Sequence, residues 1–207
     1  MKHEWRKKEK GYYVPKNEPE VITLPNFKFF MIKGKGNPND SFFGDYVGVL
    51  YSLSYAIRMS LKAGFAPEDY FEYTVYPLEG VWDISDEAKQ DYTGVLDKNS
   101  LIFNLMIRQP DFATHEFVQK ALERTKKKKP HALLDSVEFS EIEEGRCVQM
   151  MHNGSYDNEP ESFKQMEIFC KENKLYRTSK KHREIYLSDA RKVTPEKLKT
   201  VLRFKIK

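Results

Sequence analysis

The periodicity of apolar and polar residues changes several times along the chain, and each change marks a predicted element. Residues 21–34 are largely apolar, break at Pro25 and end in a Gly-Lys-Gly-Asn-Pro turn, which predicts a strand. From Phe42 to Ala63, apolar side chains recur every three or four residues. We therefore expect a helix with one buried face that ends at Gly64.

Two extended segments follow this helix. In residues 70–82 the side chains alternate between two faces, with Glu72 and Tyr76 on the same face. One face must be core, which leaves the other available to line a cavity. Residues 101–107 are almost continuously apolar, which is typical of a strand in the middle of a sheet. The Asp-, Lys- and Gly-rich residues 83–99 are expected to form an exposed connection.

The second half of the chain gives a similar order of elements. The predicted elements are a helix over 111–129, strands over 137–142 and 146–152, a helix from about 159, a strand over 183–188, a short helix from Thr194 and a strand over 201–206. A turn is expected at Glu144-Gly145. The order strand, helix, strand, strand thus occurs twice without any repeat of residues, and it predicts an α+β fold.

Composition limits the class of protein. The 207 residues, 40% of them hydrophobic, are enough for one large domain or two small ones. No apolar run approaches the roughly 18 residues that a membrane-spanning helix needs, and residues 1–10 are too charged for a secretory signal. We therefore expect a cytoplasmic protein. Residues 1–20 lack periodicity and contain Gly11, Pro15 and Pro19, which predicts a flexible arm.

Charge and cysteines argue against several kinds of site. Cys147 and Cys170 form no CxxC pair, so a thiol-rich metal centre is excluded and both are expected to be buried thiols. A net charge of +4 argues little for nucleic acid. The basic run Lys126–Lys129 fits the last turn of a helix, with a phosphate-binding patch as the alternative. The Gly34/Gly36 turn lacks the pattern of a phosphate or dinucleotide loop. Neither a cofactor nor a metal is expected.

The most suggestive chemistry lies between Cys147 and Asp189. Glu184 and Tyr186 stand two residues apart on a predicted strand, so their side chains share one face. A carboxylate beside an aromatic ring is a plausible floor for a pocket that holds a flat, partly cationic ligand. The same spacing is also common on ordinary amphipathic strands, where Glu faces water.

The order and spacing of these segments resemble the GyrI-like small-molecule-binding domains, which are related to the effector domains of multidrug-sensing transcription regulators. The resemblance lies in the strand 148–152, the Asn153-Gly154-Ser155-Tyr156 turn, the helix with Phe163 and Phe169, and the strand with Glu184 and Tyr186. It implies a tandem pair of strand-helix-strand-strand modules related by a pseudo-twofold axis, with an aromatic pocket between them. Residues 21–207 would form this domain, with modules at about 21–110 and 130–207.

The resemblance also implies functional residues. A glutamate on the late strand of these domains attracts cationic aromatic ligands, and Glu184 is the matching position. The ligand-binding residues it implies are Trp82, Tyr156, Tyr186, Phe42, Phe43, Glu72 and Phe169. The alternatives are an edge-packing role for Trp82 and a hydrophobic staple at Phe42 and Phe43.

One departure from the regulators concerns DNA. Residues 1–20 hold no helix-turn-helix, so the chain resembles a stand-alone member and no direct binding of nucleic acid or membrane is expected. A stand-alone subfamily is implicated in hydrolysing the cyclopropane of yatakemycin-type DNA-alkylating compounds. In that chemistry Glu184 would be the base and Tyr76 or Tyr156 the hydrogen-bond donor.

Two further groups are candidates for this chemistry. Glu72 is the candidate second carboxylate, with a solvent-facing strand residue as the alternative. His152 is a candidate base, although a histidine at the end of an apolar strand is more often packed or bonded to a turn. The alternative functions are non-catalytic sequestration of hydrophobic or cationic drugs and inhibition of a DNA enzyme such as gyrase.

Overall fold

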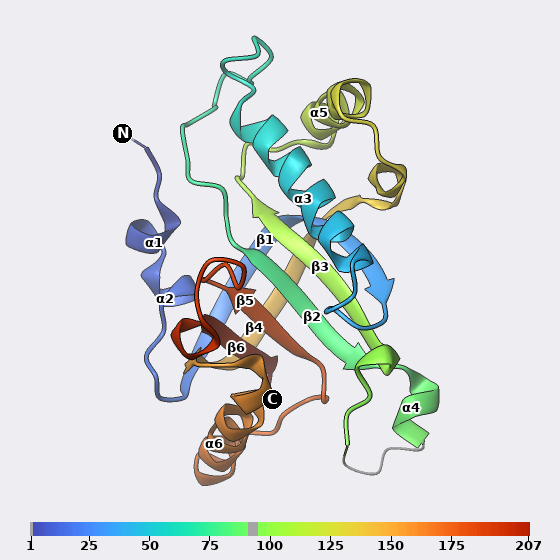
Figure 1. The fold of residues 1–207 in the computed structure, drawn as a ribbon. Coiled ribbons are helices and arrows are strands. Elements are labelled where there is room, and N and C mark those ends of the chain that lie inside the picture. The colour runs from blue at the N-terminus through green and yellow to red at the C-terminus, as the bar shows by residue number, and fades with distance from the viewer. Residues whose placement is uncertain (1, 91–94) are drawn as a thin grey trace. The chain divides into compact units, whose positions relative to one another are not determined.

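The computed structural model describes residues 2–90 and 95–207, which form two compact units. The first unit is built from Met1–Glu4, Phe27–Leu78 and Asp83–Ile142. The second is built from Trp5–Asn26, Glu79–Trp82 and Glu143–Lys207. Figure 1 follows the helices and strands from the N-terminus in blue to the C-terminus in red.

The first unit combines strands with helices. Its elements are β1 (Glu20–Lys35, from residue 27 onward), α3 (Phe42–Arg58), α4 (Asp86–Gln90), β3 (Leu101–Gln109), α5 (His115–Lys128) and the 3-10 turns Lys98–Ser100 and Ala132–Ser136. β1 pairs antiparallel with β3, and Phe30 lies opposite Ile107. α3 lies along β3 and also contacts α5 (Figure 1).

Helix α3 buries the face that the sequence predicts. Leu50, Leu53 and Ile57 recur at three- and four-residue spacing and are almost completely buried. The helix ends at Arg58, five residues before the predicted end at Ala63. The Tyr70 hydroxyl donates a 2.6 Å hydrogen bond to the Arg58 carbonyl, so a residue distant in sequence satisfies the last turn.

Helix α5 begins at His115, later than the predicted start at residue 111. The Thr114 hydroxyl accepts a hydrogen bond from the Phe117 backbone N–H, which makes Thr114 the N-cap. Lys126, Lys127 and Lys128 occupy the last turn, which confirms the expected place of the basic run at a helix end.

The predicted strand over residues 70–82 is wrong in its first part. The strand that forms, β2, covers Leu78–Ile84. Before it, Tyr70 and Phe71 turn their rings toward Phe112, with centroid distances of 5.2 and 5.1 Å. Packing of these aromatic rings overrides the local alternation, and Pro77 has no N–H to donate to a strand ladder.

The second unit contains a four-stranded antiparallel sheet. Its elements are α1 (Trp5–Lys8), α2 (Lys10–Tyr13), residues Glu79–Trp82 of β2, β4 (Glu138–Asn153, from residue 143), α6 (Glu159–Glu172), β5 (His182–Tyr186), β6 (Lys199–Lys205) and the 3-10 turns Tyr156–Asn158 and Pro195–Lys197. The strand order is β2, β5, β6, β4. Helix α6 packs on this sheet through a core of Val148, Met150, Met166, Cys170, Leu202, Phe204 and Ile206.

A predicted turn within β4 and the two cysteines can be compared with the structure. The predicted turn at Glu144-Gly145 is wrong, because the strand continues through it while Gly145 takes a φ of +70°. Glycine tolerates this left-handed conformation at little cost, so the chain can bend without ending the strand. Cys147 and Cys170 are buried free thiols, as expected.

The N-terminal segment is ordered, which corrects the expectation of a flexible arm. Trp5 and Tyr13 are buried in the second unit, with ring centroids 5.1 Å apart. The Lys16 carbonyl accepts a 2.8 Å hydrogen bond from the Met151 N–H of β4. The sequence gives no periodic pattern here because the segment is held by two aromatic anchors and by backbone carbonyls.

The order of elements confirms the α+β fold class. Strand, helix, strand, strand occurs as β1, α3, β2, β3 and again as β4, α6, β5, β6. Within the described residues, none of the helices combines the length and the apolar character that crossing a membrane requires.

Candidate functional site

Strand β5 places Glu184 in the middle of the second unit's sheet. Gly80 of β2 lies opposite Glu184 on one side and Leu202 of β6 on the other. Side chains alternate along the strand, so Glu184 shares a face with His182 and Tyr186.

Glu184 is held by two hydrogen bonds from its own strand. Its Oε1 lies 3.0 Å from Nε2 of His182, and its Oε2 accepts a 2.7 Å hydrogen bond from the Tyr186 hydroxyl. The Trp82 indole N–H donates in turn to the Tyr186 hydroxyl, at 2.7 Å. Since a carboxylate can only accept, Nε2 of His182 carries the proton. Glu184 is only 9% exposed, so this network fixes a carboxylate in a largely desolvated place.

A second carboxyl group, that of Glu159, joins this network. Glu159 lies at the start of α6 and is buried, and its ligand atoms, with those of His182 and Glu184, all lie within 4.8 Å of one another. Burial and the neighbouring charge of Glu184 raise the pKa of Glu159 well above its usual range. We call Glu159, His182, Glu184, Tyr186 and Trp82 the Glu184 cluster.

Aromatic rings border the Glu184 cluster. Tyr156 meets Tyr186 edge to face at a centroid distance of 5.9 Å, and Phe163 of α6 lies 4.7 Å from the His182 ring. Tyr156 keeps 37% of its surface exposed, so this ring borders solvent. Burial, and then the charges of Glu184 and Glu159, raise the pKa of Tyr156 to about 12. Tyr156 therefore remains a neutral hydroxyl donor at physiological pH.

Gly80 makes room for this arrangement. A Cβ at this position would lie 2.6 Å from Nε1 of Trp82 and 3.1 Å from the Tyr186 hydroxyl oxygen. Only a residue without a side chain lets the indole and the phenol meet across β2 and β5.

Four of the residues predicted from the sequence come together in this unit: Glu184, Tyr186, Trp82 and Tyr156. Phe169 packs instead against the core beneath α6. The helix residue that touches the cluster is Phe163.

The remaining predicted residues belong to the first unit. Tyr76 is buried, with the Arg108 guanidinium 4.6 Å from its ring centroid. Glu72 is largely exposed and lies 3.7 Å from Arg58, so its surroundings are those of a surface carboxylate. Phe42 and Phe43 both pack against Phe103.

His152 is packed and bonded to a turn, which is the alternative to a catalytic role. Its Nδ1 lies 2.9 Å from the Ser162 hydroxyl and its Nε2 lies 3.0 Å from the Ser155 carbonyl. The ring is buried and both nitrogens are engaged, which leaves it no free position for proton transfer.

Sequence reasoning missed Glu159 and His182. An acid in the first turn of a helix is favourable in any helix, so no local pattern shows that Glu159 faces a distant strand. His182 could have been found, since it stands two residues before Glu184 and so shares its face.

The opposite face of β5 carries a buried charge network. Arg183 lies 2.7 Å from Glu79 and 2.9 Å from Glu144. Arg203, its cross-strand partner on β6, lies 3.3 Å from the same Glu144. Two adjacent guanidinium groups are thus balanced by two carboxylates, which fixes the register of β5 and with it the direction in which Glu184 points.

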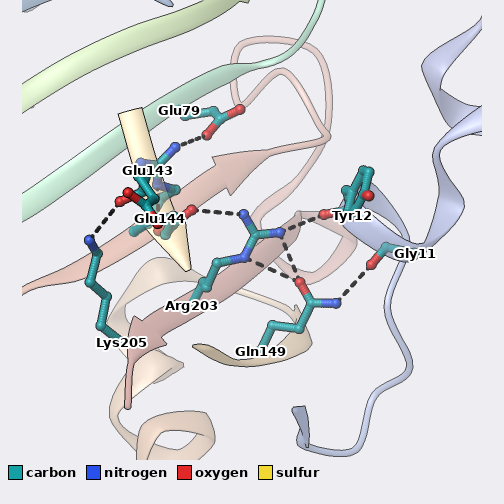
Figure 2. Close-up of polar contacts among 9 residues, drawn as sticks. Gly11, Tyr12, Glu79, Glu143, Glu144, Gln149, Arg203 and Lys205 are labelled. Atoms are coloured by element: carbon teal, nitrogen blue, oxygen red, sulfur yellow. Dashed lines mark hydrogen bonds and ion pairs between the residues drawn. The ribbon is translucent and has the colours of Figure 1, made fainter. Parts of the chain in front are cut away.

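The N-terminal segment completes this network. Figure 2 shows Arg203 bonded to Gln149, to the Tyr12 carbonyl at 2.7 Å and to Glu144. The Gln149 amide donates in turn to the Gly11 carbonyl at 2.9 Å. Helix α2 therefore provides backbone acceptors that the strands cannot supply.

Comparisons with known proteins identify the family and the fold. The sequence matches the family model of the GyrI-like small molecule binding domain over residues 17–207. A structure described as an uncharacterized conserved protein from Listeria innocua is 37% identical, with a TM-score of 0.91 and complete coverage of both chains. Another, described as a hydrolase from Listeria innocua, is 36% identical, with a TM-score of 0.89 and the same coverage.

More distant similarity is limited to the fold. The C-terminal domain of EcmrR has a TM-score of 0.56 at 12% identity, covering 92% of this chain and 97% of that domain. Among curated proteins, none matches the chain.

Proposed function

This chain belongs to the GyrI-like small-molecule-binding domain family, and we propose that it binds a flat, aromatic, partly cationic small molecule at the Glu184 cluster and hydrolyses it. The proposed substrates are DNA-alkylating compounds of the yatakemycin type, and the reaction is the opening of their strained cyclopropane. The description of a 36% identical structure as a hydrolase supports an enzymatic role.

The observation that carries the proposal is the setting of Glu184. Its two oxygens are fixed by His182 and Tyr186, and the aromatic rings of Tyr186 and Tyr156 stand beside it. A desolvated carboxylate attracts a cationic group more strongly than one in water, and aromatic faces bind flat rings. Each oxygen of a carboxylate has a second lone pair, so Glu184 can still accept a proton.

The proposed reaction needs little machinery. The cyclopropane of these compounds is conjugated to a dienone, so water can attack its outer carbon. The new C–O bond forms as the C–C bond of the ring breaks, and the electron pair moves to the carbonyl oxygen as the dienone becomes a phenolate. Glu184 takes one proton from the attacking water, and the phenolate oxygen finally gains one, so that water is added overall.

Tyr156 is the proposed hydrogen-bond donor to the developing phenolate. It belongs to the same unit as Glu184, borders solvent and stays protonated at neutral pH. A donor aimed at the oxygen where negative charge develops lowers the barrier more than one that binds the ground state. Tyr76 remains a second candidate donor from the sequence.

Turnover distinguishes hydrolysis from sequestration. Purified protein is mixed with an excess of a cyclopropane-bearing alkylator, and the ring-opened water adduct is followed by mass spectrometry. We expect several equivalents of product per chain, formed faster than in buffer. Depletion of free compound without product above the buffer rate would support sequestration and overturn the enzymatic proposal.

A further inference from the structure

The Glu184 cluster has a composition that the proposed organic ligand does not require. It brings two carboxyl groups and an imidazole, those of Glu159, Glu184 and His182, to within 4.8 Å of one another. Attraction of a cationic drug and removal of one proton each need a single carboxylate. The second carboxyl group and the imidazole therefore call for an explanation of their own.

The buried carboxyl group of Glu159 is the independent observation. Glu159 is only 6% exposed; its carboxyl group shares a hydrogen bond with that of Glu184, but across residues 2–90 and 95–207 no side-chain or backbone donor reaches its Oε1. Buried carboxyl oxygens in folded proteins almost always have a partner. An oxygen that lacks a donor and lies beside two other ligand-type atoms marks a place where a positive ion can bind.

The basic group beside these two carboxyl groups in the described residues is the imidazole of His182. Within the described part of the chain, no lysine or arginine forms an ion pair with Glu159 or Glu184. The nearby Arg183 lies on the other face of β5, where Glu79 and Glu144 engage it. The cluster thus differs from Glu79 and Glu144, whose poorly exposed side chains both contact arginine.

We propose that Glu159, His182 and Glu184 form a binding site for one divalent transition-metal ion of the zinc type. One imidazole nitrogen with two carboxylate oxygens is a donor set that suits zinc, whereas magnesium prefers oxygen ligands alone. The ion replaces the hydrogen bond between His182 and Glu184, whose 3.0 Å separation is close to the spacing of two ligands on a tetrahedral ion.

The surroundings fit such an ion. The Tyr186 hydroxyl donates to the remaining oxygen of Glu184 and holds the carboxylate in place, as outer partners of metal ligands commonly do. Phe163 packs on the His182 ring and fixes its orientation. Three protein ligands leave a fourth position open to water or to an incoming ligand.

This inference goes beyond the proposed function and does not depend on it, since ion binding is measured without any organic compound. Chelator-treated protein is titrated with Zn²⁺ alone by isothermal calorimetry, and bound zinc is counted by equilibrium dialysis with elemental analysis. We expect one saturable site per chain that Mg²⁺ does not fill.

Matched variants locate the site. Glu159→Gln preserves the shape of the side chain and removes one ligand, and His182→Ala removes another. Each is expected to weaken Zn²⁺ binding more than about 100-fold, since even loss of an outer partner costs roughly 10- to 100-fold. His131→Gln, at a half-exposed imidazole 3.9 Å from Asp45, is the control and should leave the affinity unchanged.

The outcome is decisive in either direction. Circular dichroism and thermal unfolding show whether each variant is folded. If His182→Ala does not fold, the isosteric variant Glu159→Gln is used to test the site. Absence of saturable binding in the wild type overturns the proposal. Binding that persists undiminished in Glu159→Gln, or that is lost in His131→Gln, also overturns it by placing the ion elsewhere.

Discussion

At the scale of single residues, the site depends on which side chains share a face of β5. Glu184 and Tyr186 could be predicted as neighbours, because a spacing of two on a strand is sufficient. Their contact with Trp82 could not be derived from spacing, since it depends on the pairing of β2 with β5. The proximity of Glu159 to Glu184 could not be predicted either, because it depends on the packing of α6 on the sheet.

Gly80→Ala tests the close approach of Trp82 and Tyr186. The added Cβ would meet the indole nitrogen at 2.6 Å, so one of the two rings must move. We expect the free energy of unfolding to fall by about 1–3 kcal/mol in chemical denaturation, the usual cost of overpacking.

Gly48→Ala is the matched control for this substitution. It lies within α3, and its added Cβ would meet nothing within 4 Å. A gain of about 0.5–1 kcal/mol is expected, because alanine favours helix. If Gly80→Ala were as stable as the wild type with an unchanged indole emission spectrum, the account of this contact would be wrong.

Tyr156 gives a prediction about pH. Its pKa in the folded protein is raised from 10.0 to about 12, so the neutral hydroxyl is favoured by folding. The corresponding stability is fully present below about pH 10 and is lost as the pH rises toward 12. Ultraviolet titration should show one late phenolate ionisation fewer in Tyr156→Phe than in the wild type, and an unchanged number in Tyr176→Phe, the variant of an exposed ring. An unchanged number of late ionisations in Tyr156→Phe would contradict the assignment.

At the scale of elements, periodicity predicted most of the helices and strands but few of their ends. Helix α3 was predicted from the spacing of apolar residues that include Leu50 and Ile57, whereas its last turn is completed by the hydroxyl of Tyr70. The turn predicted at Gly145 failed because glycine also permits a bend inside a strand. Local pattern specifies which face is buried, and distant contacts decide where an element stops.

Strand β5 owes its orientation to the charge network on its other face. Glu144→Gln removes the carboxylate that contacts both Arg183 and Arg203. Breaking a buried ion pair leaves charge without compensation, so the free energy of unfolding should fall by about 3–5 kcal/mol in a denaturant titration. Glu143→Gln, at the exposed neighbouring residue, should stay within about 0.5 kcal/mol of the wild type. Equal stability of the two variants would contradict a structural role for this network.

The same network predicts how stability depends on acid. Burial opposes ionisation of Glu144, but Arg183 and Arg203 outweigh it and hold the pKa below the usual range. A lowered pKa means that the stability from Glu144 is present above about pH 4.5 and is lost as the pH falls through the lowered value. Thermal unfolding should therefore show a steeper acid-induced loss in the wild type than in Glu144→Gln. Parallel pH profiles would contradict this linkage.

At the scale of the whole molecule, the N-terminal segment is part of the folded protein. Trp5 and Tyr13 anchor it, and its carbonyls complete the bonding of Arg203 and Gln149. Trp5→Ala should lower the free energy of unfolding by about 3–5 kcal/mol, the usual cost of removing a buried aromatic side chain. Val14→Ala, at a side chain that is 43% exposed, is the control and should change it by less than about 1 kcal/mol. An N-terminal segment that acts as a loose arm would show no difference between the two variants.

The match to the family model extends over residues 17–207, whereas the proposed chemistry depends on the carboxylate of Glu184. The most direct test is the rate of ring opening of a cyclopropane-bearing alkylator, compared between the wild type, Glu184→Gln and Glu161→Gln. Glu161 is exposed on the same helix as Glu159 and serves as the control. Loss of a general base predicts a rate about 100- to 10,000-fold lower for Glu184→Gln, with Glu161→Gln unchanged. A folded Glu184→Gln variant that keeps its rate within a few-fold of the wild type would contradict the proposed role of Glu184.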